Sequence, residues 1–155
     1  MIKILKDTLY KIVSIYWKIF KPKTYGVKVL IVHPTDTNKI LLILHSYGNK
    51  ILWNIPGGGY RPKKETAQQA AIREVQEELN INLQSVAKVG KYYTEIQGKR
   101  DTVILFTGKL HPSFLIEQND EIAKLKWIDH QEALEQDNVA KIAKTTIRYQ
   151  FDLVK

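Results

Sequence analysis

The sequence predicts a single α/β domain preceded by an amphipathic helix. Three observations lead to this fold class. Apolar runs rich in β-branched residues predict strands, a capped segment in the middle of the chain predicts a helix, and helical spacing of apolar residues marks both termini. The 155 residues suit one ordinary domain, and no Gly/Ser-rich linker divides them. We expect residues 1–23 to form the helix as part of the same unit and residues 24–155 to form the domain.

Residues 2–20 carry apolar side chains at helical spacing, with lysines mainly on the remaining positions. Six lysines against one aspartate before residue 24 account for +5 of the net charge of +8, which is therefore not spread over a groove for nucleic acid. Two interpretations of the apolar face stay open. The helix packs on the domain or on a second copy of the chain in a homodimer, or residues 2–20 bind a membrane surface.

Neither export nor a transmembrane anchor is expected. The longest apolar stretch of the N-terminal segment falls far short of the ~20 residues that span a bilayer, and Asp7 and Lys11 interrupt any signal-peptide core. The chain has no cysteine, which excludes a disulfide framework, a zinc–thiolate site and a thiol nucleophile. Together these features predict a cytoplasmic protein.

Strands are predicted where apolar residues alternate or run together between turn signals. A mostly buried strand and its antiparallel return strand come first, a hairpin that turns through residues 98–101 follows the central helix, and one more strand comes later. The predicted strands are Tyr25–His33, Ile40–Leu44, Val86–Ile96, Thr102–Leu110 and Leu125–Ile128. Helical spacing then predicts helices over Gln131–Gln136 and Val139–Phe151.

The central helix carries most of the acids. Thr66 and Gln69 form a capping-box pattern that places the start of the helix near Ala67. Four-residue spacing puts Glu74 and Glu78 on one face. The same spacing allows Arg73 to pair with Glu77 and offset part of the repulsion between the carboxylates.

A glycine run precedes this helix. Gly57, Gly58 and Gly59 permit positive φ angles and let the backbone approach a phosphate or a metal ion closely. Glu65, between the glycines and the helix, could close the turn. Clustered carboxylates suit Mg²⁺ or Mn²⁺, which bind a few of them and share their remaining positions with water and substrate phosphates.

The segment from Gly59 to Ile81 resembles the Nudix box, G-x5-E-x7-R-E-U-x-E-E-x-G-U, in which U is a bulky aliphatic residue. It departs from the box only at Asn80, which stands in place of the second glycine. Asparagine is the next best residue for a left-handed helix C-cap, so we expect the turn to survive. The matching residues are Gly59, Glu65, Arg73, Glu74, Val75, Glu77, Glu78 and Ile81.

The resemblance implies an α/β/α sandwich with a mixed β-sheet and an enzyme that hydrolyses a nucleoside diphosphate linked to another moiety X. By position it implies Glu74, Glu77, Glu78 and the carbonyl of Gly58 as metal ligands, although Glu74 could instead be the base. Arg73 and Glu65 would brace the loop together with Gly59. Family members often take the base from a later loop, where we favour Glu121.

The substrate stays open. The missing basic groove favours a small soluble nucleotide over nucleic acid, but a capped RNA 5′ end is not excluded. Five aromatic residues could stack on a nucleobase or pack in the core or a hairpin. The four histidines lack the spacing of metal ligands and are expected to be structural or surface residues. These are Tyr47, Trp53, Tyr60, Tyr92 and Tyr93, and His33, His45, His111 and His130. The alternative function is nucleotide sensing without hydrolysis, although such a domain would be expected to have lost box acids.

Overall fold

A computed structural model of the chain describes residues 2–48, 51–95, 98–117 and 119–153. Within these residues, five strands form one mixed sheet in the order β3-β4-β1-β2-β5, with β1 parallel to β4 and the other neighbours antiparallel. The strands are β1 (Lys23–Val32), β2 (Lys39–His45), β3 (Ser85–Thr94), β4 (Arg100–Lys109) and β5 (Ile122–Asp129). The helices are α1 (Ile2–Phe20), α2 (Ala67–Leu79), α3 (His130–Glu135) and α4 (Lys141–Gln150).

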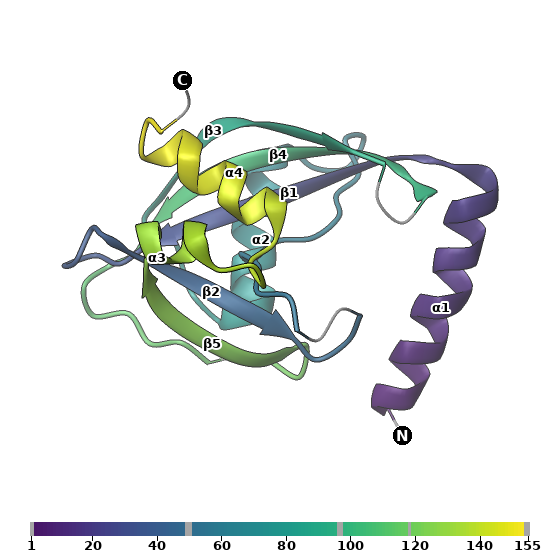
Figure 1. The fold of residues 1–155 in the computed structure, drawn as a ribbon, viewed down its shortest axis with the longest axis horizontal. Coiled ribbons are helices and arrows are strands. Elements are labelled where there is room, and N and C mark those ends of the chain that lie inside the picture. The colour runs from purple at the N-terminus through teal and green to yellow at the C-terminus, as the bar shows by residue number, and fades with distance from the viewer. Residues whose placement is uncertain (1, 49–50, 96–97, 118, 154–155) are drawn as a thin grey trace.

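The sheet lies between two helical layers, with α2 on one face and α3 and α4 on the other (Figure 1). Successive residues of β1 point to opposite faces, so Val29 and Ile31 pack with α2 while Leu30 packs with α4. The small Ala70 and Ala71 let α2 approach the sheet closely, and both are fully buried. The predicted α/β/α sandwich and its mixed sheet are confirmed.

The predicted elements all exist, with ends shifted by one to three residues. β1 begins two residues earlier than predicted, and β5 extends the predicted Leu125–Ile128 at both ends. Residues 100 and 101, assigned to a turn, instead begin β4, because they continue the ladder with β1. Ile96, the last residue of the predicted strand, lies outside the described residues, as do the side chains of Ile2 and Leu5.

A splay between β1 and β2 creates the place for the functional site. The two strands pair at Val32 and Ile40 and then diverge, and the glycine-rich segment fills the space between them. The amide of Val29 donates to the carbonyl of Pro56, and the amide of Val27 donates to the carbonyl of Gly58, each at 2.9 Å. The glycine run is therefore fixed to the sheet as a partial extra strand beside β1.

The predicted N-terminal helix is present, and most of the apolar side chains described on it are exposed and do not pack on the domain. Figure 1 shows α1 standing beside the sandwich, joined to it at the start of β1. None of the described α1 side chains belongs to either of the two core clusters. Within the described residues, no helix has the length and apolar character needed to cross a membrane.

Candidate metal and phosphate site

Helix α2 positions the acids as its sequence predicts. The capping box is present, because the amide of Gln69 donates to the Thr66 hydroxyl and the amide of Thr66 donates to the Gln69 side chain. With the helix start fixed at Ala67, Glu74 and Glu78 face the glycine run. The amide of Gly57 donates to Glu78 Oε2 at 3.0 Å.

Burial distinguishes the three carboxylates of the box. Glu78 is 4% exposed, the Glu74 side chain is 14% exposed, and the Glu77 side chain is 58% exposed. Burial is the largest effect on Glu78 and raises the pKa of its carboxyl to about 7, against the opposing effects of Lys28 and the Gly57 amide. Burial also raises the pKa of Glu74, opposed by the Arg73 guanidinium. The glycine run is therefore lined by buried carboxylate oxygen atoms whose charge a nearby cation would stabilise.

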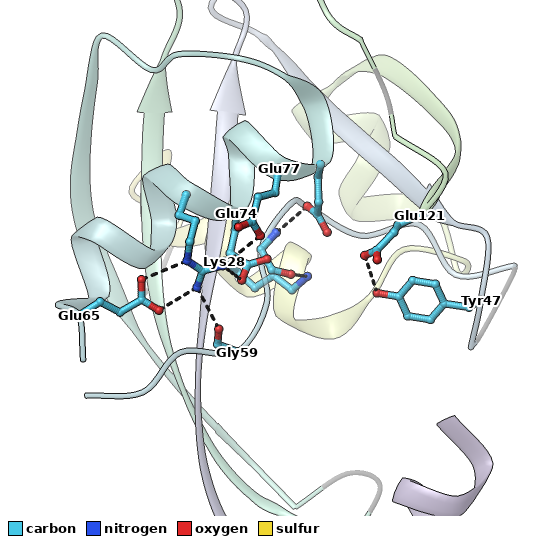
Figure 2. A network of polar contacts seen from close by, with 10 residues as sticks. Lys28, Tyr47, Gly59, Glu65, Glu74, Glu77 and Glu121 are labelled. Carbon is cyan, nitrogen blue, oxygen red and sulfur yellow. Dashed lines mark hydrogen bonds and ion pairs between the residues drawn. The ribbon is translucent and has the colours of Figure 1, made fainter. Parts of the chain in front are cut away.

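Arg73 holds the box together more fully than the sequence indicates. Its guanidinium binds Glu65 in a two-pronged pair at 2.8 and 3.1 Å, and it also contacts Glu74 at 2.7 Å and Glu77 at 3.1 Å (Figure 2). One nitrogen donates to the carbonyl of Gly59 at 3.3 Å. The predicted pair of Arg73 with Glu77 is present, and Arg73 and Glu65 lie where a bracing pair would lie.

The space around Gly57 requires a glycine, and the space at Gly58 is narrow. Gly57 has φ of +131°, and a Cβ atom there would lie 2.2 Å from the carbonyl oxygen of Val27. A Cβ atom at Gly58 would lie 2.5 Å from a carboxylate oxygen of Glu74. The Gly58 carbonyl accepts from the Val27 amide and keeps its second lone pair. The loop thus brings the backbone of Gly58 close to the carboxylate of Glu74.

Lys28 is a site residue that the sequence reasoning missed. It alternates with Val27 and Val29 and therefore points to the sheet face opposite α2. Its ammonium group donates to the carbonyls of Ile55 and Gly57, both at 2.9 Å. Burial lowers the pKa of Lys28, and the nearby Glu78 and Glu74 raise it. A lysine between the apolar Val27 and Val29 was the signal that could have revealed it.

Glu121 lies on the far side of the site from Glu65 (Figure 2). Its carboxylate is close enough to raise the pKa of Glu78, and the Tyr47 hydroxyl lies 3.5 Å from one of its oxygens. The preceding loop is bound to the C-terminal end of α2, since Asn119 donates to the carbonyls of Glu77 and Glu78. Two further acids, Glu117 and Asp120, lie in the same loop.

His45 differs from the other histidines because it lies at the edge of this site. Its ring lies 5.3 Å from the Tyr47 ring, and its buried Nδ1 has no hydrogen-bond partner. Burial, with the Lys28 charge as the second cause, lowers the pKa of His45 to about 4. The imidazole is therefore neutral near pH 7, and its proximity to the acids could not be read from sequence spacing.

His45 should make the stability of the fold depend on pH. Between its unfolded pKa near 6.5 and about 4, the unfolded chain takes up a proton that the folded chain does not. This contribution to the free energy of unfolding therefore decreases as the pH falls through that range. We expect His45→Gln to gain stability relative to the natural chain between pH 6.5 and 4. Urea unfolding at several pH values measures it, with the exposed His111→Gln as the control; parallel curves for the natural chain and His45→Gln would contradict it.

Asn80 takes the left-handed conformation predicted for it, with φ of 53° and ψ of 35°. Its side chain also donates to Glu117 at 2.8 Å and accepts from Gln76 at 2.8 Å. The asparagine therefore replaces the glycine of the box without losing the turn, and it adds exposed contacts to the loop that carries Glu121.

Asn80→Gly should change the free energy of unfolding by no more than about 1 kcal/mol, because relief at positive φ offsets two exposed hydrogen bonds. Turnover should stay close to that of the natural chain, since backbone bonds from Glu117 and Asn119 still hold the loop. Asn80→Ala is the control and should be less stable, because alanine disfavours this conformation. Thermal unfolding and a turnover assay measure both effects, and a folded but inactive Asn80→Gly would show that the side chain does more than cap.

The donor set was tested against the expected ion. Among the described residues, no three acidic or histidine side chains converge as ligands of one ion. Glu74 and Glu78 nevertheless bring hard carboxylate oxygen atoms to the glycine run, where the Gly58 carbonyl is a further hard oxygen atom. Mg²⁺ commonly takes one or two carboxylates and completes its shell with water and substrate phosphates. The residues therefore fit a divalent ion whose coordination a bound diphosphate would complete.

Comparison with known proteins agrees with this geometry. The NUDIX domain family model matches residues 24–150. A Bacillus subtilis (strain 168) protein provisionally named 8-oxo-dGTP diphosphatase is 32% identical over 105 residues, which cover 68% of this chain and 66% of that protein.

Two solved structures share the fold. The MutT protein of Methanosarcina mazei Go1 is 22% identical, with a TM-score of 0.73 over 88% of this chain and 99% of that one. The NUDIX domain of Shewanella oneidensis NrtR, solved with ADP ribose, is 17% identical, with a TM-score of 0.71 over 89% of this chain and 92% of that one. Together with the family match and the box residues, these similarities show that the chain belongs to the Nudix family.

Proposed function

We propose that this protein hydrolyses the pyrophosphate linkage of a nucleoside diphosphate linked to another moiety X, with Mg²⁺ or Mn²⁺. The observation that carries the proposal is the buried Glu78 carboxylate, which accepts from the Gly57 amide beside Glu74 and close to Glu121. Burying so many acids next to a glycine loop is costly for the fold alone, because each carboxylate loses hydration. A cation and a phosphate ligand would offset that cost.

In this proposal Glu74, Glu77, Glu78 and the Gly58 carbonyl hold the divalent ion. When bound, the ion supplies positive charge that polarises phosphoryl oxygens and lowers the pKa of water. Glu77 is exposed and bound to Arg73. It therefore reaches the site only if that contact loosens.

Glu121 is proposed as the general base that accepts the proton of the attacking water. It stands across the site from Arg73 and Glu65, and the Tyr47 hydroxyl near one of its oxygens would orient the carboxylate. Arg73 and Glu65 keep a positioning role, because their paired contact holds the Gly59 carbonyl and fixes the loop.

A cavity of about 1010 Å³ beside the box loop is the proposed place for part of the substrate. Its lining includes Tyr25 and Tyr60, whose ring centroids lie 6.1 Å apart, and the cationic Arg61, Lys63 and Lys64. These charges favour an X that carries further phosphate over a neutral sugar. The name of the Bacillus subtilis relative refers to a nucleoside triphosphate substrate, which agrees with this preference.

Hydrolysis of a substrate panel tests the proposal. The panel contains nucleoside triphosphates, an oxidised nucleotide, dinucleoside polyphosphates and nucleotide sugars, each assayed with Mg²⁺, with Mn²⁺ and with a chelator. We expect metal-dependent cleavage, fastest for the compounds with additional phosphate. Arg61→Gln should raise KM for these compounds while the exposed Arg148→Gln leaves it unchanged. Binding without cleavage of any compound would favour the nucleotide-sensing alternative.

A further inference from the structure

The part of the apolar face of α1 that the structure describes is exposed to solvent. Most of the large apolar side chains described on this helix are more than half exposed, from 52% for Tyr16 to 68% for Ile19. The set is Leu9, Ile12, Ile15, Tyr16, Ile19 and Phe20. So many exposed apolar side chains on one helix mark an interaction surface, because scattered single ones are what an ordinary surface shows.

The contact that α1 makes with the domain turns this face outward. The Lys99 ammonium lies 4.4 Å from the centre of the Trp17 ring, and Gly98 lies so close to the Lys18 backbone that a Cβ atom would approach within 2.5 Å. Trp17 is thus on the side of the helix that meets the domain. Ile15 and Ile19 lie about 160° away from it around the helix, at 100° per residue, and point to solvent.

Hydrogen bonds hold the link between α1 and β1 in a defined conformation. Lys21 ends the helix with φ of 41°, and its amide donates to the carbonyl of Trp17 at 2.9 Å. Pro22 then accepts from the amide of Arg100, and the Lys21 carbonyl accepts from the Arg100 guanidinium. These contacts set the direction in which the apolar face points.

Charge decides between the possible occupants of this face. The exposed Lys11 and Lys18 lie along one edge of the apolar face, and no acidic residue occurs in the sequence between Asp7 and Asp36. Paired helices of two copies use a narrow apolar seam flanked by opposite charges, which this helix lacks. A broad apolar arc bordered by lysines, with aromatic residues within it, is typical of a helix at an anionic lipid surface.

We propose that α1 binds the surface of an anionic phospholipid membrane, with Ile12, Ile15 and Ile19 inserted at the boundary between headgroups and acyl chains and the lysines near the headgroups. Trp17 also lines the cavity beside the box loop. Binding through α1 therefore places that cavity on the side of α1 that faces away from the lipid. The proposal stands independently of the hydrolytic activity, since it depends on α1 alone.

Co-sedimentation of the full chain with vesicles tests the proposal. We expect pelleting with vesicles that contain phosphatidylglycerol and little with vesicles of phosphatidylcholine alone. Ile19→Glu should weaken partitioning by about tenfold or more, because it removes a large apolar side chain from the lipid boundary. Lys11→Gln should weaken it by about fivefold, the effect of one lysine near an anionic surface.

Matched controls separate this outcome from general effects of charge and folding. Leu115 lies outside α1 and is 80% exposed, so Leu115→Glu makes the same change of charge as Ile19→Glu. Lys91→Gln removes an exposed lysine from β3 and is the control for Lys11→Gln. Both controls should pellet like the natural chain, and circular dichroism should show all variants folded. Absence of pelleting, or equal pelleting of Ile19→Glu, would overturn the proposal. A dimer that dissociates in Ile19→Glu without any vesicle binding would assign the face to a second copy.

Discussion

Glu78→Gln should lower turnover by about a hundredfold or more while the chain stays folded. The substitution removes the buried charge that the proposed site uses to hold a divalent ion, an interaction of several kcal/mol. The glutamine oxygen can still accept from the Gly57 amide, so the loop keeps its contact. Turnover with Mg²⁺ measures the effect, and the exposed Glu135→Gln is the control. Turnover equal to that of the natural chain would remove Glu78 from the site.

The same variant should change the pH dependence of stability. The pKa of the Glu78 carboxyl is about 7 in the folded chain, and its ordinary value is 4.5. Between these two pH values the folded chain keeps the proton of this carboxyl, whereas the unfolded chain has released it. The stability contributed by this group is therefore present below about pH 4.5 and is lost as the pH rises through 7. Glu78→Gln should be at least as stable as the natural chain at pH 8 without metal, as thermal unfolding would show.

Lys28→Met should decrease the free energy of unfolding by about 3–5 kcal/mol, the usual cost of removing one member of a buried charge cluster. The carbonyls of Ile55 and Gly57 would lose their donor, and Glu78 would lose the charge that opposes its raised pKa. Urea unfolding measures the stability, with Lys124→Met on the exposed side of β5 as the control.

Lys28→Met should also affect the reaction through Glu78. Without the lysine charge, the carboxyl keeps its proton to a higher pH, so the rise of turnover with pH should move upward. Lys28→Arg, which keeps a cation in the strand, should restore part of that shift. Loss of stability with no movement of the pH profile would restrict Lys28 to holding the loop.

The sequence predicted those parts of the site that depend on local spacing. The capping box fixes the first residue of α2, and the four-residue spacing then places Glu74 and Glu78 toward the glycine run. Asn80 follows the same logic, because its left-handed conformation depends only on its place at the helix end. A helix defined by its own residues can be predicted from them.

Contacts between distant segments were not predictable in this way. Lys28 meets the glycine loop only because β1 and β2 splay, and His45 reaches the site only because β2 ends beside the loop that carries Glu121. The outward direction of α1 depends on its contact with Gly98 and Lys99, which no pattern within residues 2–20 contains. Each of these outcomes required the arrangement of the whole sheet.

The parallel pairing of β1 with β4 has a kinetic consequence. Partners in this ladder are far apart in the chain: Thr24 and Asp101, for example, are separated by 77 positions. The segment between the two strands contains α2 and the glycine run. Closing the ladder therefore costs the conformational entropy of a long loop before the contacts between the strands stabilise the chain. The acids of α2 can share a local helix early in folding, but they face the glycine run only after this slow, non-local step.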